Sequence, residues 1–489
     1  MKMRKKAIFG LAAAAVFTAF SLSGCGGGKS GYDKLLNKND PVTIKIWHYY
    51  NGVQQTQFDE MVSEFNDTVG SDKGIYVEAY SKNSVSELAD SVIASVNKDP
   101  GAEEAPDIFG TYVETAYQID KLGMLADLNA YFSDEEKAGY VDEYISEGIF
   151  GVDGSMKIFP TAKSTEVMIL NLTDWKDFAD AEDVTYDDMT TWEGLARVAE
   201  KYYNYTDALT PDKENDGRAF FGRDSVANYM IIGAKQLGHP FADADDDGKV
   251  RVSADKDTIK KLWDNFYVPY VKGYYAAEGR FRSDDVKTGT VIALICSTTG
   301  AAYYPSEVTI GDEDAYPIDN MVLNVPNFEG TDPYAVQQGA GMSVIKSNEK
   351  REYASAVFLK WFTEEERNIR FSVNSGYLPV KKAANDFDKI SSGDTASKIN
   401  ATMLNTLKIA IDEINNCSLY TSPPFDKSAQ TRDFIGETIE KSAKDDRASA
   451  WERINAGEAR DKVLEEYTSD AAFDAWYDAF EKGLTSVSE

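Results

Sequence analysis

Apolar and polar residues follow two alternating periods along most of the chain. Residues 41–47 (PVTIKIW) alternate apolar and polar positions and are rich in β-branched side chains, which is typical of a half-buried strand. Residues 58–65 then place apolar side chains at helical spacing. Further strand-like and helix-like stretches follow in turn, and from about residue 396 the pattern is helical, with a break at 422–425. The alternation of the first strands and helices predicts an α/β lobe with a mainly parallel sheet.

The chain begins with a different pattern. Residues 1–6 carry four positive charges, and residues 7–20 are apolar apart from Gly10 and Thr18. This arrangement is typical of a secretory signal peptide, because the apolar run is short for a membrane span of about 20 residues. A retained anchor helix is the alternative. Residues 22–25 (LSGC) resemble the bacterial lipobox, which implies removal of residues 1–24, a lipid such as palmitate on Cys25, and a linker over 25–40.

Length and charge limit the possible functions. A chain of 489 residues is too long for one core, so two or more lobes are expected. The formal net charge is −31, and loss of the signal peptide removes four positive charges, giving −35. Such a polyanion is repelled by phosphate backbones, which argues against nucleic-acid binding. After Cys25 only Cys296 and Cys417 remain; a disulfide is possible, but the apolar surroundings of Cys296 favour a buried thiol.

Few residues point to catalysis. The chain has two histidines, His48 and His239, and it lacks a phosphate-binding P-loop motif and the paired-cysteine or H-E-x-x-H zinc motifs. A pair of carboxylates for glycoside hydrolysis remains an alternative, since the chain contains 82 acidic residues. The sequence therefore predicts a protein that is not an enzyme and needs no cofactor.

Two acidic loops resemble half of a calcium-binding loop. One carries Asp243, Asp245 and Asp247 followed by Gly248, but Ala254 stands where a bidentate glutamate belongs. The loop at 212–217 likewise has Arg223 at its closing position. The simpler interpretation is a pair of Asp/Gly turns before strands, so calcium is a weak expectation.

Aromatic and polar residues gather where predicted strands end. Residues 47–52 (WHYYNG) follow the first strand, and 109–112 (FGTY) follow the third. Open α/β sheets bind ligands at the carboxyl ends of their strands. Aromatic faces beside hydroxyl and amide groups suit a sugar ring, which has an apolar face and a polar rim.

A series of motifs in one order extends these observations. The motifs are residues 44–47 (IKIW), 105–108 (APDI), 123–128 (GMLADL), 160–171, 191–195 (TWEGL), 216–222, 288–294, 325–330, 339–345 and 376–380 (GYLPV). Together they resemble the family 1 extracellular solute-binding proteins of ABC transporters, the maltose-binding-protein-like group. Two departures stand out: Leu170 replaces a tyrosine, and residues 298–300 (TTG) stand where many relatives carry tryptophan.

The resemblance implies two hinge-linked α/β lobes of the type II periplasmic-binding-protein fold, with the chain crossing between them more than once. Lobe 1 is expected to hold residues 41–166 and 322–347, and lobe 2 residues 170–320 and 350–489. The ligand then lies in the cleft between the lobes, which close around it by hinge rotation.

The resemblance also implies a set of cleft residues. From lobe 1 these are Tyr49, Tyr50, Asn51, Thr111, Tyr112 and Glu114; from lobe 2 they are Arg223, Asn228, Tyr229, Ser297, Thr298, Thr299 and Tyr303; further candidates are Gln337, Gln338, Tyr377, Tyr420 and Phe425.

The implied function is capture of a carbohydrate, most simply an oligosaccharide, by a monomeric lipid-anchored protein on the outer face of a bacterial cell membrane. The protein then delivers the sugar to an ABC permease. One alternative keeps this role for glycerol phosphate or a phosphosugar, with Arg223 and Lys163 as the cationic anchors. The other alternative is a surface glycoside hydrolase or a carbohydrate-adhesion lipoprotein.

Overall fold

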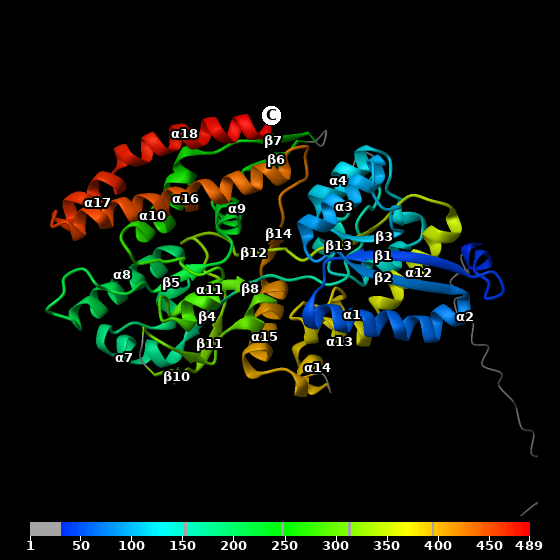
Figure 1. Cartoon of the computed structure of the whole chain (residues 1–489), viewed down its shortest axis with the longest axis horizontal. Coiled ribbons are helices and arrows are strands. Elements are labelled where there is room, and N and C mark those ends of the chain that lie inside the picture. Colours follow the sequence, from blue (N-terminus) through cyan, green and yellow to red (C-terminus); the bar gives the residue numbers. More distant parts are fainter. Residues whose placement is uncertain (1–30, 151–153, 246–248, 312–313, 394–395) are drawn as a thin grey trace, which may run out of the picture.

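The chain folds into two α/β lobes that lie side by side, as the computed structural model in Figure 1 shows. The structure describes residues 31–150, 154–245, 249–311, 314–393 and 396–489, so the predicted signal peptide and Cys25 lie outside the described residues. Each lobe is built around a four-stranded sheet. The two-lobed α/β architecture expected from the sequence is confirmed. No described helix is both long enough and apolar enough to span a membrane.

The sheet of lobe 1 has the strand order β13-β3-β1-β2. Its strands are β1 (Val42–His48), β2 (Ile75–Ser81), β3 (Ile108–Thr111) and β13 (Gly341–Val344). The first three are parallel, whereas β13 runs antiparallel to β3. In β1 the alternating residues Ile44 and Ile46 are fully buried, as their period of two predicts. Helices α1 (Gly52–Phe65), α3 (Val85–Asn97) and α4 (Val113–Lys121) connect and cover these strands.

The sheet of lobe 2 has the strand order β11-β4-β8-β5. Its strands are β4 (Glu166–Asn171), β5 (Phe221–Arg223), β8 (Ala293–Ser297) and β11 (Asn320–Leu323). Strand β4 is antiparallel to both of its neighbours, and among the described strands of this sheet only the pair β5–β8 is parallel. The mainly parallel sheet predicted from the first strands is found in lobe 1, whereas the sheet of lobe 2 is mixed, because β4 enters directly from lobe 1 without a crossover helix.

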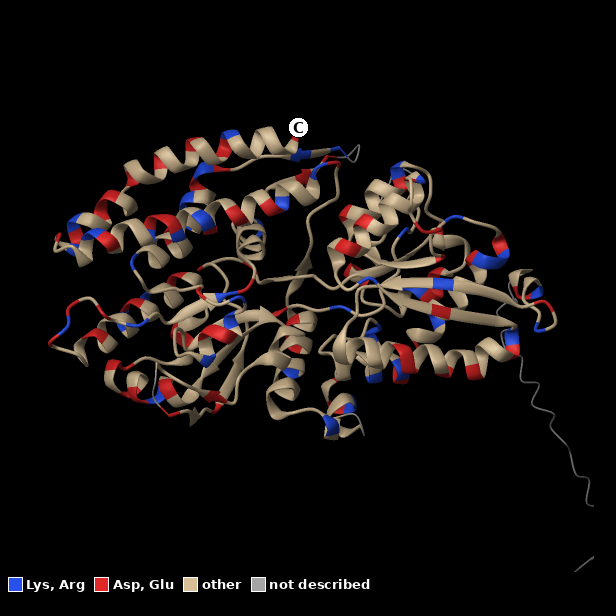
Figure 2. Ribbon diagram, in the orientation of Figure 1, with Lys and Arg blue, Asp and Glu red and all other residues tan. Residues whose placement is uncertain are grey.

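Helices surround the sheet of lobe 2. They are α7 (Leu172–Glu182), α8 (Trp192–Ala208), α9 (Val226–Gln236), α10 (Lys256–Val271), α15 (Ala401–Asn416), α16 (Ser428–Asn455), α17 (Arg460–Thr468) and α18 (Asp470–Ser488). The three C-terminal helices pack over α9 and α10 and share one hydrophobic core with them. Acidic side chains are spread along the helices of both lobes, with basic ones between them (Figure 2).

The division of the chain between the lobes differs from the expected one. Helices α12 (Glu349–Phe362) and α13 (Glu365–Ser375) pack into the core of lobe 1, where Phe358 contacts Phe58 and Phe65. Both helices were expected in lobe 2. Strand β11 pairs with β4 in lobe 2, although residues 322 and 323 were expected in lobe 1. Apolar periodicity identifies a buried face, but it does not say which sheet that face covers.

The lobes are joined by a row of crossing segments, here called the hinge layer: residues 163–165, 337–339 and 376–378. Lys163 bridges to Leu378, and Ser164 bridges to Gln338. Two glycines allow this close approach of backbones. A side chain on Gly339 would lie 2.9 Å from the Cα of Lys163, and one on Gly376 would lie 2.9 Å from the Cα of Thr299 in lobe 2; both glycines have positive φ angles.

A buried acid braces lobe 2 beside this layer. Glu413 on α15 is 3% exposed and accepts hydrogen bonds from the backbone N–H of Val325 (3.1 Å) and the hydroxyl of Thr165 (3.4 Å). Burial, with smaller contributions from the charges of Glu166 and Asp412, raises the pKa of Glu413 to about 8. The folded protein therefore binds a proton at Glu413 that the unfolded chain releases near its ordinary pKa of 4.5.

This acid predicts a pH dependence of stability. A carboxyl group whose pKa is raised on folding lowers the free energy of unfolding as pH increases from about 4.5 to about 8, by up to about 1.4 kcal/mol per pH unit. We expect Glu413→Gln to remove this slope, since the amide does not ionise. Urea unfolding of both proteins at several pH values across that range measures the two slopes. Their difference cancels the contributions of other titratable groups. Equal slopes in the two proteins would contradict the prediction.

Candidate ligand-binding cleft

A cavity of about 460 Å³, here called the interlobe cavity, opens between the two lobes. Lobe 1 contributes the N-terminal residues of α3 and α4 together with Glu147, and the hinge layer contributes Gln337 and Gln338. Lobe 2 contributes α9, the start of β6 (Ala242–Ala244), residues 420–425 and the first turns of α16. Two helices of lobe 1 and one of lobe 2 therefore begin at the same cavity.

Arg432 is held in the wall of lobe 2 by a chain of polar contacts. Its guanidinium donates to the side-chain oxygen of Asn228 (2.5 Å). The amide of Asn228 donates in turn to Glu166 (2.9 Å) and to Gln338 of the hinge layer (3.4 Å). Glu166 also accepts from Arg223 (2.7 Å), and both members of this pair are buried. The chain of contacts fixes one side of Arg432 and leaves other N–H groups for a ligand.

The wall of lobe 1 presents carboxylates. Glu114 lies in the first turn of α4, and Glu147 pairs with the buried Lys163, which also donates to the carbonyl of Gly339 (2.8 Å). Burial raises the pKa of Glu114; Arg432 lowers it, while Glu147 and Asp433 raise it. Glu114 and Arg432 thus interact across the cavity from opposite lobes, with room for a ligand that contacts both.

Aromatic rings complete the lining. They are Tyr112 from lobe 1 and Phe241, Tyr420 and Phe425 from lobe 2. Pro423 and Pro424 lie between Tyr420 and Phe425 and restrict the backbone of this segment. Aromatic faces combined with a few placed polar groups are typical of sites that bind a ring with an apolar face and a polar rim.

Residues 60–398 match the family described as bacterial extracellular solute-binding protein. The chain belongs to this family. Among solved structures, it is similar to a cyclic alpha-maltosyl-1,6-maltose binding protein from Arthrobacter globiformis, with 20% identity, a TM-score of 0.64, and 92% of this chain and 99% of that one covered. No curated protein sequence matches this chain.

Two other structures share the fold of this solute-binding protein. UgpB from Mycobacterium tuberculosis, in complex with glycerophosphocholine, is 15% identical with a TM-score of 0.63, over 92% of this chain and 98% of that one. The ABC substrate-binding protein Lmo0181 from Listeria monocytogenes, in complex with cycloalternan, is 17% identical with a TM-score of 0.62, over 90% and 99%. At these identities the likeness shows the fold alone, and it covers nearly the whole of each chain.

Six of the predicted cleft residues line the interlobe cavity of this solute-binding protein. They are Tyr112, Glu114, Asn228, Gln338, Tyr420 and Phe425, and the predicted Gln337 lines it as a seventh. Thr111, just before them, is buried and donates its hydroxyl to the carbonyl of Tyr112 (2.8 Å).

The residues after β1 occupy different surroundings. Tyr50 and Tyr377 are buried in the core of lobe 1, and the hydroxyls of Tyr49 and Tyr377 lie 3.1 Å apart. Asn51 is exposed and donates to the carbonyl of Asn83. None of these side chains lines the interlobe cavity.

Arg223 and Tyr229 form part of the interior of lobe 2. The hydroxyl of Tyr229 donates a hydrogen bond to the carbonyl of Leu262 (2.8 Å), and Arg223 forms an ion pair with Glu166. Neither lines the interlobe cavity, although both border a smaller cavity of about 230 Å³ inside lobe 2. Arg223 and Lys163, the predicted anchors for an anionic ligand, are both paired with buried glutamates.

The residues after β8 line another groove. Ser297, Thr299 and Tyr303 border it, and Thr298 is fully buried beside them. None of the residues that line this groove lines the interlobe cavity. The family resemblance implied one cleft for these residues and for Tyr112 and Glu114, but the hinge layer separates the two sets.

Several lining residues were not predicted, above all Arg432 and Glu147. Arg432 lies in the second turn of a helix whose pattern indicated packing only, and nothing in its local sequence marks it. The interruption of the helical pattern at 422–425 was the available signal, because it indicates a turn just before the start of α16.

The described residues contain no group of three or more His, Cys, Asp or Glu side chains placed to hold a metal ion. Asp243 lies in β6, and Asp245 accepts a hydrogen bond from the backbone of Lys249 (2.9 Å), as in an Asp turn. Asp247 lies outside the described residues. Cys296 and Cys417 are free thiols, and the former is buried as expected.

Proposed function

We propose that this extracellular solute-binding protein captures a neutral carbohydrate in the interlobe cavity and delivers it to an ABC permease. The observation that carries the proposal is the placement of Arg432 from lobe 2 and Glu114 from lobe 1 in the lining of one cavity, which is edged by Tyr112, Phe241, Tyr420 and Phe425. Guanidinium and carboxylate groups together donate to and accept from hydroxyls, and the rings cover the apolar faces of a sugar. The lipid on Cys25 holds the protein at the outer face of the membrane, where it acts as a monomer.

The charge of the cavity favours a neutral ligand over a phosphorylated one. Among the described residues that line it, Glu114, Glu147 and Asp433 are acidic and Arg432 is the one cation. Lys163 lies behind Glu147 and neutralises it. A phosphate would have to approach Arg432 against Glu114 and Asp433, whereas hydroxyls pair with either kind of group. A glycoside hydrolase would have to act through these same carboxylates. Recovery of the intact sugar after incubation would therefore argue against the hydrolase alternative.

A thermal-shift screen of residues 31–489, which contain both cores, tests the proposal. The screen compares mono-, di- and oligosaccharides and polyols with phosphosugars and glycerol phosphate. A ligand at 100 times its dissociation constant stabilises a protein by about 2.7 kcal/mol. We expect shifts with neutral sugars, and chromatography should recover these sugars intact. Shifts with phosphorylated compounds alone, or sugar recovered as hydrolysis products, would contradict the proposal.

A further inference from the structure

The groove bordered by the residues after β8 is the largest of the described cavities, at about 800 Å³. It is here called the lobe 2 groove, and it is lined by Asp224, the helix α11 (Arg282–Lys287), Phe281 before that helix, and residues 297–307. Gln54 of α1 in lobe 1 also lines it. Gln337 of the hinge layer lines the interlobe cavity, whereas Gly376 of the same layer packs against Thr299, which lines this groove. The two cavities therefore meet different parts of the layer.

Two exposed aromatic rings stand at the groove. Phe281 is 53% exposed and Tyr303 is 76% exposed, which makes them two of the most exposed large apolar side chains that the structure describes. Both come from lobe 2, from segments about 20 residues apart, and both line the same groove. A ring-shaped ligand with apolar faces would remove both from water.

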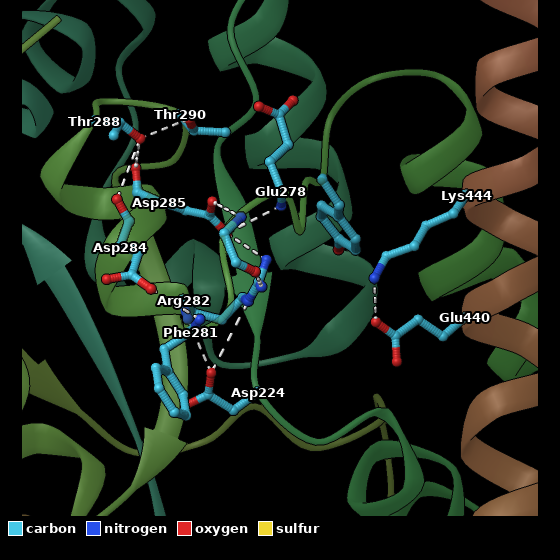
Figure 3. A network of polar contacts seen from close by, with 12 residues as sticks. Asp224, Glu278, Phe281, Arg282, Asp284, Asp285, Thr288, Thr290, Glu440 and Lys444 are labelled. Carbon is cyan, nitrogen blue, oxygen red and sulfur yellow. Dashed lines mark hydrogen bonds and ion pairs between the residues drawn. The ribbon is translucent and has the colours of Figure 1, made fainter.

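The wall that carries Phe281 is held by a polar network around the buried residues Arg282 and Asp285 (Figure 3). The guanidinium of Arg282 pairs with Asp285 and donates to the carbonyl of Gly279, and its backbone N–H donates to Asp224 (3.0 Å). The backbone N–H of Phe281 donates to Asp284 (3.1 Å). The network fixes the backbone on both sides of the phenylalanine. Such preorganisation lowers the entropy that binding must overcome.

The polar groups of the groove suit a ligand with hydroxyls and no charge. The hydroxyls of Ser297 and Thr299 lie 2.9 Å apart at the end of β8. Asp224, Asp284 and Glu307 supply hydrogen-bond acceptors, and Lys287 is the one cation among the described lining residues. The neighbouring Arg282 does not line the groove; it is buried and forms an ion pair with Asp285. Three carboxylates against one ammonium disfavour an anion.

We propose that the lobe 2 groove is a second carbohydrate site that holds one neutral sugar ring against Phe281 and Tyr303. The carboxylates and hydroxyls of its floor bind the hydroxyls of the ring. The site is separate from the interlobe cavity, and it does not depend on which solute that cavity captures.

Saturation-transfer NMR on residues 31–489 tests this second site. The parent protein carries Glu114→Gln and Arg432→Ala, so that the interlobe cavity is impaired. One derivative adds Phe281→Ala and Tyr303→Ala, and the matched control adds Tyr76→Ala, another exposed tyrosine (52%) on β2. The probes are glucose, galactose, mannose, xylose and N-acetylglucosamine at millimolar concentration.

We expect at least one probe to give a signal with the parent and the control, and its apparent Kd to rise roughly tenfold when both rings are removed. Unchanged melting temperatures show that the derivative is folded. No signal from any probe with the parent, or an equal Kd in parent and ring-less derivative, would overturn the second site. Failure of the thermal-shift screen with the unmodified protein would instead overturn the function of the interlobe cavity, so the two results are distinguishable.

Discussion

Replacing Glu166 by alanine is expected to lower the free energy of unfolding by about 3–5 kcal/mol. The side chains of Glu166 and Arg223 are 5% and 1% exposed, and their charged ends are 2.7 Å apart. Without the carboxylate, Arg223 keeps its bond to the carbonyl of Ser225 (2.8 Å) and its stacking over Trp192, but its charge remains buried and uncompensated. Urea unfolding followed by circular dichroism measures the loss.

Two controls separate this effect from ordinary truncation. In Glu166→Ala/Arg223→Met both charges are removed, so most of the lost stability should return. Glu440→Ala breaks the half-exposed pair that Glu440 forms with Lys444 on α16 (2.7 Å) and should cost no more than about 0.5 kcal/mol. A loss below about 1 kcal/mol in Glu166→Ala would show that Arg223 reaches water or finds another partner.

The sequence was informative wherever a local pattern decides the outcome. The alternation at 41–47 predicted β1 within a residue or two, and the helical spacing at 58–65 predicted the buried face of α1. Tyr112 was found because the end of a parallel strand lies at the ligand edge of a sheet whatever its neighbours are, whereas Glu114 was implied by the family resemblance.

Prediction failed wherever the path of the chain between lobes decides the outcome. The apolar face of α12 is visible in the sequence, but it covers β1, which is about 300 residues away. Ser297, Thr299 and Tyr112 all follow strands, yet the hinge layer places them at different cavities. Arg432 reaches the cleft only because residues 421–427 bring α16 across to it. No local periodicity records these long-range arrangements.

Removing the guanidinium of Arg432 is expected to weaken binding of the sugar found in the thermal-shift screen by roughly 10- to 100-fold, because hydrogen bonds to a charged group contribute about 1.5–3 kcal/mol each. Arg432 is partly buried, and its contact with Asn228 fixes its position. Isothermal titration calorimetry of Arg432→Ala against the unmodified protein measures the change in Kd.

The position of Arg432 should contribute to binding in addition to its charge. Arg432→Lys keeps the charge but not the planar fork, so we expect it to recover only part of the lost affinity. Asn228→Ala leaves the guanidinium in place without its support, and it should weaken binding by less than Arg432→Ala does. Lys427→Ala, which removes a cation just before α16 that does not line the cavity, serves as the matched control and should leave Kd unchanged. If Arg432→Ala binds as tightly as the control, then the cavity does not hold the sugar through this side chain, and Glu114 alone would have to orient the ligand.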